Sequence, residues 1–302
     1  MRTATRTLLL ALLPSLLCGC AALEKMQETH RERRFDAAAE KLAASPDADS
    51  LAAAGALLLA RQPQRSLALL RQASEAAPER ADLAWLQASA CEAKNGCDRE
   101  AMDRKLRALD ATNGAGWLAA VARADASGDE TAKDEALAAI SRSQRVDTYW
   151  TTLVAKLSRA MVRTGLVPLP EAEVQVIGIL AAEALPGYSA TSNACKGERL
   201  QSAGVIDTCR GVAHAFRQGD TYITEMVGVA IARRVWPEGA PEWNSAVEAR
   251  RSFEGRSALV AKVDPPWNRG AAERYLALCE RNAREQDVLK AQLLAAGKKD
   301  PP

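Results

Sequence analysis

The sequence predicts an all-α protein, and two observations carry that prediction. Alanine, leucine, arginine and glutamate dominate, aromatic residues make up only 4%, and β-branched residues are sparse. This mixture favours helix over a β-sandwich or barrel. Between Leu51 and about Thr164, turn-forming residues recur at regular intervals and separate runs of about a dozen helix-forming residues. We therefore expect helical hairpins in this stretch and a second helical region after it.

The N-terminal segment has the features of an export signal. Two arginines precede an apolar run that ends at Leu17 and is too short to span a bilayer as a helix. Residues 17–20, Leu-Cys-Gly-Cys, resemble the lipobox of bacterial lipoproteins. The resemblance implies removal of residues 1–19, diacylation of the Cys20 thiol and anchoring in the lipid bilayer. Ala21 in place of an aspartate implies sorting to the outer membrane, and we expect the protein to face the periplasm. The alternative to lipidation is cleavage as a generic secretory signal.

Residues 20–46 are expected to form a helical or partly flexible tether between membrane and body, because they mix both charges and contain few apolar residues. The signal segment carries two basic residues and no acid. The mature chain therefore has equal numbers of basic and acidic side chains. This balance gives no electrostatic footprint for nucleic acid.

Residues 47–165 carry a repeating pattern of breakers and large residues. Asp98 and Asp129 stand where helix N-caps are needed, directly after glycine-containing turns. Large residues open successive helical runs at nearly constant spacing: Leu51, Trp85, Trp117 and Trp150. The spacing resembles the tetratricopeptide repeat, whose period is 34 residues. The resemblance covers roughly residues 47–150 and implies a TPR-like α-solenoid.

The match to that repeat is degenerate. Gly55 falls near the small site of the first helix, and Pro78 matches the proline that closes a unit. The next two units lack this proline, and the aromatic residue expected in the middle of each repeat is missing. Coincidental tryptophan spacing is the alternative, although the breakers share the same period.

The period is lost in residues 166–297, which are expected to form a C-terminal helical region. One helix should end at Pro186-Gly187, and a polar loop should cover residues 189–198. A helix over residues 221–236 has a broad apolar face, and a final helix is expected over residues 271–296. Residues 298–302 should form a disordered tail.

The cysteines that remain after Cys20 is acylated are expected to form staples. Spacing favours two disulfides, Cys91–Cys97 and Cys195–Cys209, in an oxidising compartment. Cys279 is left free and buried in a helix. A zinc site is the alternative, but no C-x-x-C pair exists and neither histidine lies near a cysteine at ligand spacing.

No catalytic, cofactor or metal-binding residue is predicted. His30 lies in the tether, and His214 is expected on a core-facing helix without partners at usable spacing. Residues 114–119 match G-x-G-x-x-A, but a helical run precedes them where a dinucleotide-binding turn needs a strand. Acid–base chemistry by one of the many helix carboxylates is left open.

Three tryptophans border the proline-rich loops of the C-terminal region and are candidate partner-binding residues: Trp236, Trp243 and Trp267. Capping of the core edge is the competing explanation for them. The sequence thus favours a non-catalytic scaffold that binds envelope proteins. By architecture it resembles repeat lipoproteins that serve as secretin pilotins or outer-membrane assembly factors. The alternatives are a cell-wall-acting enzyme or wall-binding protein that uses the repeats as a docking arm, and a purely structural role.

Overall fold

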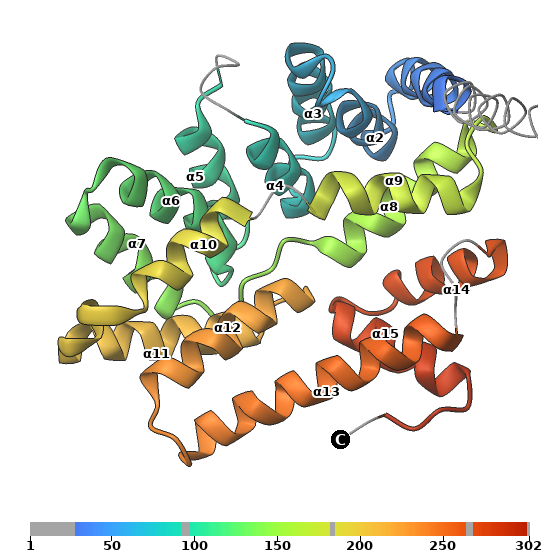
Figure 1. Cartoon of the computed structure of the whole chain (residues 1–302). Coiled ribbons are helices and arrows are strands. Elements are labelled where there is room, and N and C mark those ends of the chain that lie inside the picture. Colours follow the sequence, from blue (N-terminus) through green and yellow to red (C-terminus); the bar gives the residue numbers. More distant parts are fainter. Residues whose placement is uncertain (1–27, 92–96, 182–184, 264–267, 301–302) are drawn as a thin grey trace, which may run out of the picture.

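The computed structural model describes residues 28–91, 97–181, 185–263 and 268–300. Within these ranges every regular element is a helix, and the only strand-like pairing is an isolated bridge between Asn113 and Arg145. The all-helical fold class is therefore confirmed. A first helix covers residues 28–43. The others, with two short 3-10 turns, follow in chain order (Figure 1): α2 Ala48–Leu58, α3 Pro63–Ala76, α4 Ala81–Ala90, α5 Arg99–Leu109, η2 Gly114–Trp117, α6 Leu118–Ser127, α7 Glu130–Ser141, α8 Trp150–Arg163, α9 Leu169–Ala181, α10 Leu185–Ala194, η3 Gly197–Gln201, α11 Ala203–Arg217, α12 Tyr222–Val235, α13 Pro241–Val263, α14 Arg269–Cys279 and α15 Glu285–Ala295.

The helix over residues 28–43 belongs to the folded body, although the sequence places it in the tether. Its apolar side chains are buried, Phe35 and Leu42 among them. Arg34 pairs with Glu171 of α9 at 2.7 Å, and Glu40 accepts both guanidinium nitrogens of Arg65 in α3 at 2.6 Å. Only residues 20–27 of the expected tether lie outside the described residues.

Residues 48–141 form three consecutive helical hairpins, in which α2 packs on α3, α4 on α5, and α6 on α7. Gly55 allows the first of these contacts, because a Cβ at this position would lie 2.7 Å from Cγ of Leu70. Asp98 caps α5 and Asp129 caps α7, each accepting a backbone N–H three residues later. Both predicted N-caps are confirmed.

Helix α8 opens the expected fourth unit, and it returns to the start of the hairpins. It packs against α2 and α9, and α9 also touches α2 (Figure 1). Lys156 of α8 lies 3.7 Å from Asp82 of α4, whose carboxylate is also paired with Arg80. The first and fourth units are therefore in direct contact.

The remaining helices form a second group around α11 and α12 (Figure 1). Helix α10 packs on α6 and α12, α11 packs on α7 and α12, and α13 packs on α12 and α15. Helix α14 lies against α8, α9 and α15. Within the described ranges, no helix is long and apolar enough to cross a lipid bilayer.

Two helix boundaries in the C-terminal region differ from the sequence expectation. Pro186-Gly187 does not end a helix: Pro186 is the second residue of α10, a position that needs no N–H donor. Gly187 lets this helix approach α6, because a Cβ there would lie 2.7 Å from Cβ of Leu118. Residues 189–194, expected in a polar loop, are therefore helical, and Thr191 donates a hydrogen bond to the Gly187 carbonyl at 2.8 Å.

The expected final helix is broken between α14 and α15. Residues 280–284 turn away from the helix axis, and Arg284 donates to the carbonyls of Gly219 and Arg217 at 3.2 Å each. The Glu285 N–H donates to the Asp220 carbonyl at 2.7 Å. These contacts to the α11–α12 turn compensate for the interrupted helix. Part of the tail that was expected to be disordered is held by the fold, because Asp300 pairs with Arg256 at 2.6 Å.

Both predicted disulfides are present. Cys91–Cys97 joins the end of α4 to the residue before the N-cap of α5, and Cys195–Cys209 joins the end of α10 to α11. Cys279 is free and buried in α14, as expected. Burial raises the pKa of the Cys279 thiol to about 12, so this cysteine is a poor nucleophile.

Candidate functional site

An apolar stripe on α12 is left uncovered by the rest of the fold. Four side chains at positions i, i+3, i+4 and i+7 make up this stripe: Ile223, Met226, Val227 and Ala230. Ile223 is 47% exposed, and the other three are half-buried. The opposite side of α12 is buried, with Ala232 fully enclosed, and Ile231 beside the stripe is also fully buried. The helix therefore uses one face for the core and presents a second apolar face at the surface.

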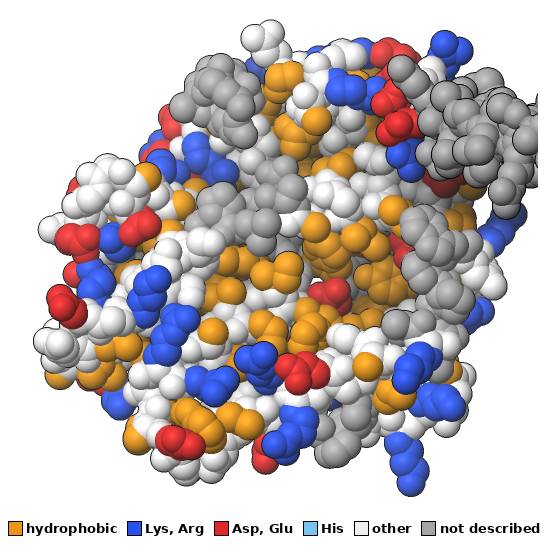
Figure 2. Space-filling view, in the orientation of Figure 1, with side chains coloured by type: hydrophobic (Ala, Val, Ile, Leu, Met, Phe, Trp, Pro, Cys, Tyr) orange, Lys and Arg blue, Asp and Glu red, His pale blue; other side chains and the backbone are white. Residues whose placement is uncertain are grey.

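The stripe forms the floor of a groove, which we call the α12 groove. Phe253 of α13 stands on one side and Ser192 of α10 on the other, around an open volume of about 380 Å³. Figure 2 shows hydrophobic side chains running across the middle of this face, with an acidic side chain among them and basic side chains gathered below. The lining of the groove is mainly apolar, and charged side chains line the adjoining volume at the C-terminal half of α12.

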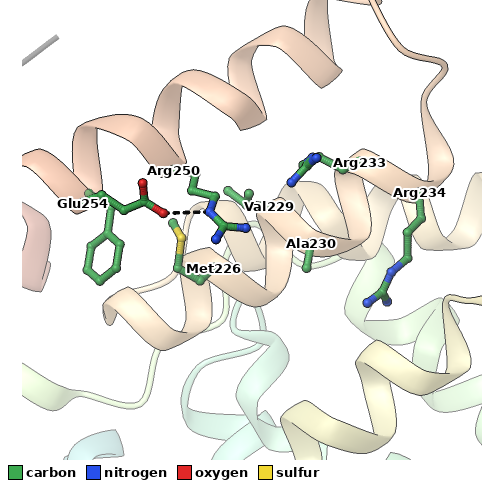
Figure 3. Close-up of a pocket in the computed structure, with 8 residues that line it drawn as sticks. Met226, Val229, Ala230, Arg233, Arg234, Arg250 and Glu254 are labelled. Atoms are coloured by element: carbon green, nitrogen blue, oxygen red, sulfur yellow. Dashed lines mark hydrogen bonds and ion pairs between the residues drawn. The ribbon is translucent and has the colours of Figure 1, made fainter.

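The C-terminal half of α12 forms a basic end of this groove. A volume of about 560 Å³ lies between α12 and α13, lined by Met226, Arg233, Arg250 and Glu254, among others. Arg250 pairs with Glu254 at 2.9 Å, and Arg233 points into the same space between the two helices (Figure 3). Guanidinium groups therefore outnumber carboxylates at this end.

Neither arginine of α12 has a carboxylate partner among the described residues. The Arg233 guanidinium lies 5.7 Å from the ring centre of Trp243, and Arg234 donates to the Ser192 carbonyl at 2.9 Å. An aromatic ring and a carbonyl leave the two positive charges uncompensated. The basic end therefore favours an anionic group from another molecule.

A small pocket of about 110 Å³ lies beside the N-terminal end of the groove. Its lining includes Trp150, Tyr188, Tyr222 and Glu285, and Tyr222 also borders the groove. One Glu285 oxygen accepts the backbone N–H of Tyr222 at 2.8 Å and thereby satisfies the first turn of α12. Burial raises the pKa of Glu285 above its ordinary value, although this hydrogen bond opposes the shift. Burial also raises the pKa of Tyr222 to about 12.

Asp220 fixes the two helices that meet at this pocket. Its carboxylate is buried and accepts the N–H groups of Thr148 at 2.9 Å and Trp150 at 2.8 Å, at the start of α8. Asp220 itself precedes the N-cap of α12. Burial, reinforced by the neighbouring Asp147 carboxyl, raises the pKa of Asp220 well above its usual range despite the two backbone donors. All these partners are internal, so Asp220 has a structural role.

The residues predicted as partner-binding fall at different places. Trp243 borders the basic end through its contact with Arg233. Trp236 follows the last turn of α12, where the Arg210 guanidinium lies 6.0 Å from its ring centre. Trp267 and the predicted lipidation site Cys20 lie outside the described residues. Sequence reasoning identified the apolar face of α12 but missed Arg233, Arg250 and Glu285, because their neighbours come from other helices.

His214 lies on the outer side of α11, contrary to the expected core-facing position. Val212, Ala213, Ala215 and Phe216 are fully buried, which leaves His214 as the exposed position of that turn. In the part of the chain that the structure describes, no group of three or more histidine, cysteine, aspartate or glutamate side chains is placed to hold a metal ion.

Comparison with protein-family models, with curated proteins and with solved structures found no match for this chain.

Proposed function

We propose that this protein is a lipid-anchored, non-catalytic adaptor of the bacterial cell envelope, which binds a helical segment of a partner protein in the α12 groove. The observation that carries the proposal is the uncovered stripe of α12 beside arginines that have no carboxylate partner. An apolar groove with spacing i, i+3, i+4, i+7 suits an amphipathic helix. Its floor extends about 10 Å along α12, or roughly two helical turns.

The charges around the groove favour one orientation of the partner helix. Arg233 and Arg250 lie at the C-terminal end of α12, and Glu285 lies at its N-terminal end. Helices are stabilised by acidic residues in their first turn and basic residues in their last turn. A partner helix antiparallel to α12 would place its acidic first turn beside the arginines and its basic last turn beside Glu285.

The anchor is the second part of the proposal. The lipobox-like residues 17–20 support acylation of Cys20, and disulfides are typical of exported proteins. The helix over residues 28–43, which follows the expected anchor in the chain, belongs to the folded body. It lies at the opposite end of the molecule from α13 (Figure 1). Because Ala21 rather than an aspartate follows Cys20, we place the protein at the outer membrane, facing the periplasm. The position of the first helix favours a groove directed away from the bilayer.

The hairpin region would serve as the arm between anchor and groove. Helices α2–α7 pack as consecutive hairpins, which supports a TPR-like arrangement. In this arrangement α8 closes the short arm by returning to α2, and α10 and α11 fix the groove region on α6 and α7.

In-cell photo-crosslinking tests this function. A photoreactive amino acid replaces Ile223 in the groove, and a matched variant carries it at Leu166, which is 39% exposed in the α8–α9 turn. We expect the Ile223 probe to capture one envelope protein, the Leu166 probe not to capture it, and Met226→Glu to abolish the adduct. Equal capture at both positions would refute binding of the partner in the α12 groove. Capture of wall fragments in place of a protein would favour a wall-binding or wall-acting role.

The same cells test the anchor. Cys20→Ser should release the protein from membranes or leave an uncleaved precursor, whereas Cys279→Ser should remain membrane-bound. A Cys20→Ser protein that is processed and still membrane-bound would contradict lipidation at this residue.

A further inference from the structure

The small pocket at the N-terminal end of α12 has an aromatic wall and an acidic group. Trp150 opens α8, Tyr222 opens α12, Tyr188 comes from α10, and Glu285 opens α15. The volume of about 110 Å³ is sufficient for one compact group but not for a peptide segment. Ile223 and Tyr222 line both this pocket and the α12 groove, so the two volumes are adjacent.

Glu285 is a largely buried carboxylate without a cation. Its Oε2 accepts the Tyr222 N–H at 2.8 Å, and its Oε1 has no hydrogen-bond partner among the described residues. In the same ranges, no lysine or arginine is close enough to lower its pKa; only the Tyr222 N–H does so. The adjacent Arg284 is directed to the carbonyls of Gly219 and Arg217. A carboxylate in this setting is costly to keep ionised unless a positive group is brought to it.

The aromatic side chains favour the same kind of ligand. The faces of tryptophan and tyrosine attract an ammonium group, most strongly where water is excluded. Tyr188 and Tyr222 are only 4% and 6% exposed, so the pocket wall is largely withdrawn from water. The pocket lining thus combines one carboxylate with aromatic side chains, a composition that suits an organic cation.

We infer that this pocket binds a single organic ammonium group, the side chain of a lysine in the partner segment that occupies the α12 groove. An ammonium is compact, whereas a guanidinium would need several acceptors in a plane. The inference that a partner lysine supplies the ammonium group rests on the proposed function. The inference that the pocket binds an ammonium group does not. The lysine also fixes the direction of the partner helix, because the basic last turn of that helix lies at Glu285 and its acidic first turn lies at Arg233.

The test uses n-butylammonium, which reproduces the end of a lysine side chain, and the purified anchored protein in detergent micelles at slightly alkaline pH. Isoleucine methyl groups are labelled for NMR, with Ile223 assigned through Ile223→Val. We expect a saturable shift of the Ile223 methyl and none of Ile140, which is fully buried in the core. The neutral analogue 1-pentanol should bind at least about ten-fold more weakly, because it lacks the charge.

Glu285→Gln is the decisive variant. Glutamine retains the acceptor for the Tyr222 N–H but loses the charge, so butylammonium affinity should fall at least about ten-fold. Glu280→Gln is the control, because Glu280 is an exposed acid on the same turn that pairs with Arg159. Absence of a saturable shift, or equal affinity in Glu285→Gln, would overturn the ammonium site.

A second arm separates a partner lysine from a free amine. Glu285→Gln should lower photo-crosslinking from Ile223 in cells at least about ten-fold if a lysine of the partner enters the pocket. If Glu285→Gln leaves crosslinking unchanged while the wild-type protein binds butylammonium, the partner lysine is refuted and the pocket is a site for a small free amine. If no variant crosslinks, the proposed function fails while the ammonium site is still judged by NMR.

Discussion

The arginines of the hairpin region and those of the α12 groove have opposite surroundings. Arg80 bridges Asp49 and Asp82, and Arg123 contacts Glu100 and Asp103. Arg233 and Arg234 of α12, in contrast, have no acidic partner within the described ranges, and Glu285 has no basic one. The hairpin region satisfies its charges internally, as a scaffold does. The groove region retains charges that a second molecule can neutralise.

The buried acids of the two regions differ in the same way. Burial raises the pKa of Asp82 in α4, but the hydrogen bonds and charge of Arg80 outweigh this and lower it below the ordinary value. Burial raises the pKa of Glu285 without a cation to reverse the shift. The Asp82 carboxylate therefore has its cation within the fold, whereas the Glu285 carboxylate has no cation among the described residues.

The largest predicted effect on stability comes from removing the disulfides, one in the hairpin region and one in the C-terminal region. Removing Cys195–Cys209 by a double change to serine should lower the free energy of unfolding by about 3 kcal/mol, and removing Cys91–Cys97 by roughly 2 kcal/mol, because the second loop is shorter. Urea denaturation measures both. Thiol counting on denatured, unreduced mature protein should find one free cysteine, Cys279; five free thiols would contradict both bridges.

Removing one arginine from each region tests the comparison directly. Arg80→Ala leaves the buried Asp82 carboxylate without its main partner and should cost about 2 kcal/mol of stability. Arg233→Ala should change stability by less than about 0.5 kcal/mol, because this side chain is exposed. It should instead weaken partner crosslinking from Ile223. Equal destabilisation by both variants would contradict the distinction between scaffold and groove.

The pH dependence of two neutral variants should have opposite signs. The lowered pKa of Asp82 stabilises the fold above pH 3.8, and this contribution is lost as the pH falls through the folded-state pKa. The raised pKa of Glu285 costs stability as the pH rises above 4.5. Relative to wild type, Asp82→Asn should therefore become less stable, and Glu285→Gln more stable, as the pH rises from acid to neutral. Urea denaturation across this pH range measures both differences. If the stability of both variants relative to wild type changed with pH in the same direction, the contrast between Asp82 and Glu285 would be refuted.

Local features were predicted well from the sequence. Asp98 and Asp129 cap their helices because an N-cap depends on a side chain and a backbone N–H only three residues apart. Cys91–Cys97 and Cys195–Cys209 pair because short separations bring their ends together. The apolar face of α12 followed from helical periodicity alone. In each case the deciding residues are near neighbours in the chain.

Features that depend on distant segments were not predicted. Pro186-Gly187 is typical of a helix end, yet both residues lie in the first turn of α10, where Gly187 packs against Leu118 of α6. His214 faces outward because the neighbours of α11 cover the other sides of that turn. The arginines of α12 gave no signal of their own, since only the placement of α13 shows which charges remain unpaired.

The sequence by itself determined the helical class, the caps, the disulfide pairs and a helix over residues 221–236 with a broad apolar face. Only the tertiary structure decided what lies around that stripe. The break between α14 and α15 forms because Arg284 and the Glu285 N–H bond to the α11–α12 turn, more than 60 residues earlier in the chain. This break places the Glu285 carboxylate beside Tyr222 and Trp150. Helical periodicity records which face of a segment is apolar, but the partner of that face is set by packing between segments far apart in sequence.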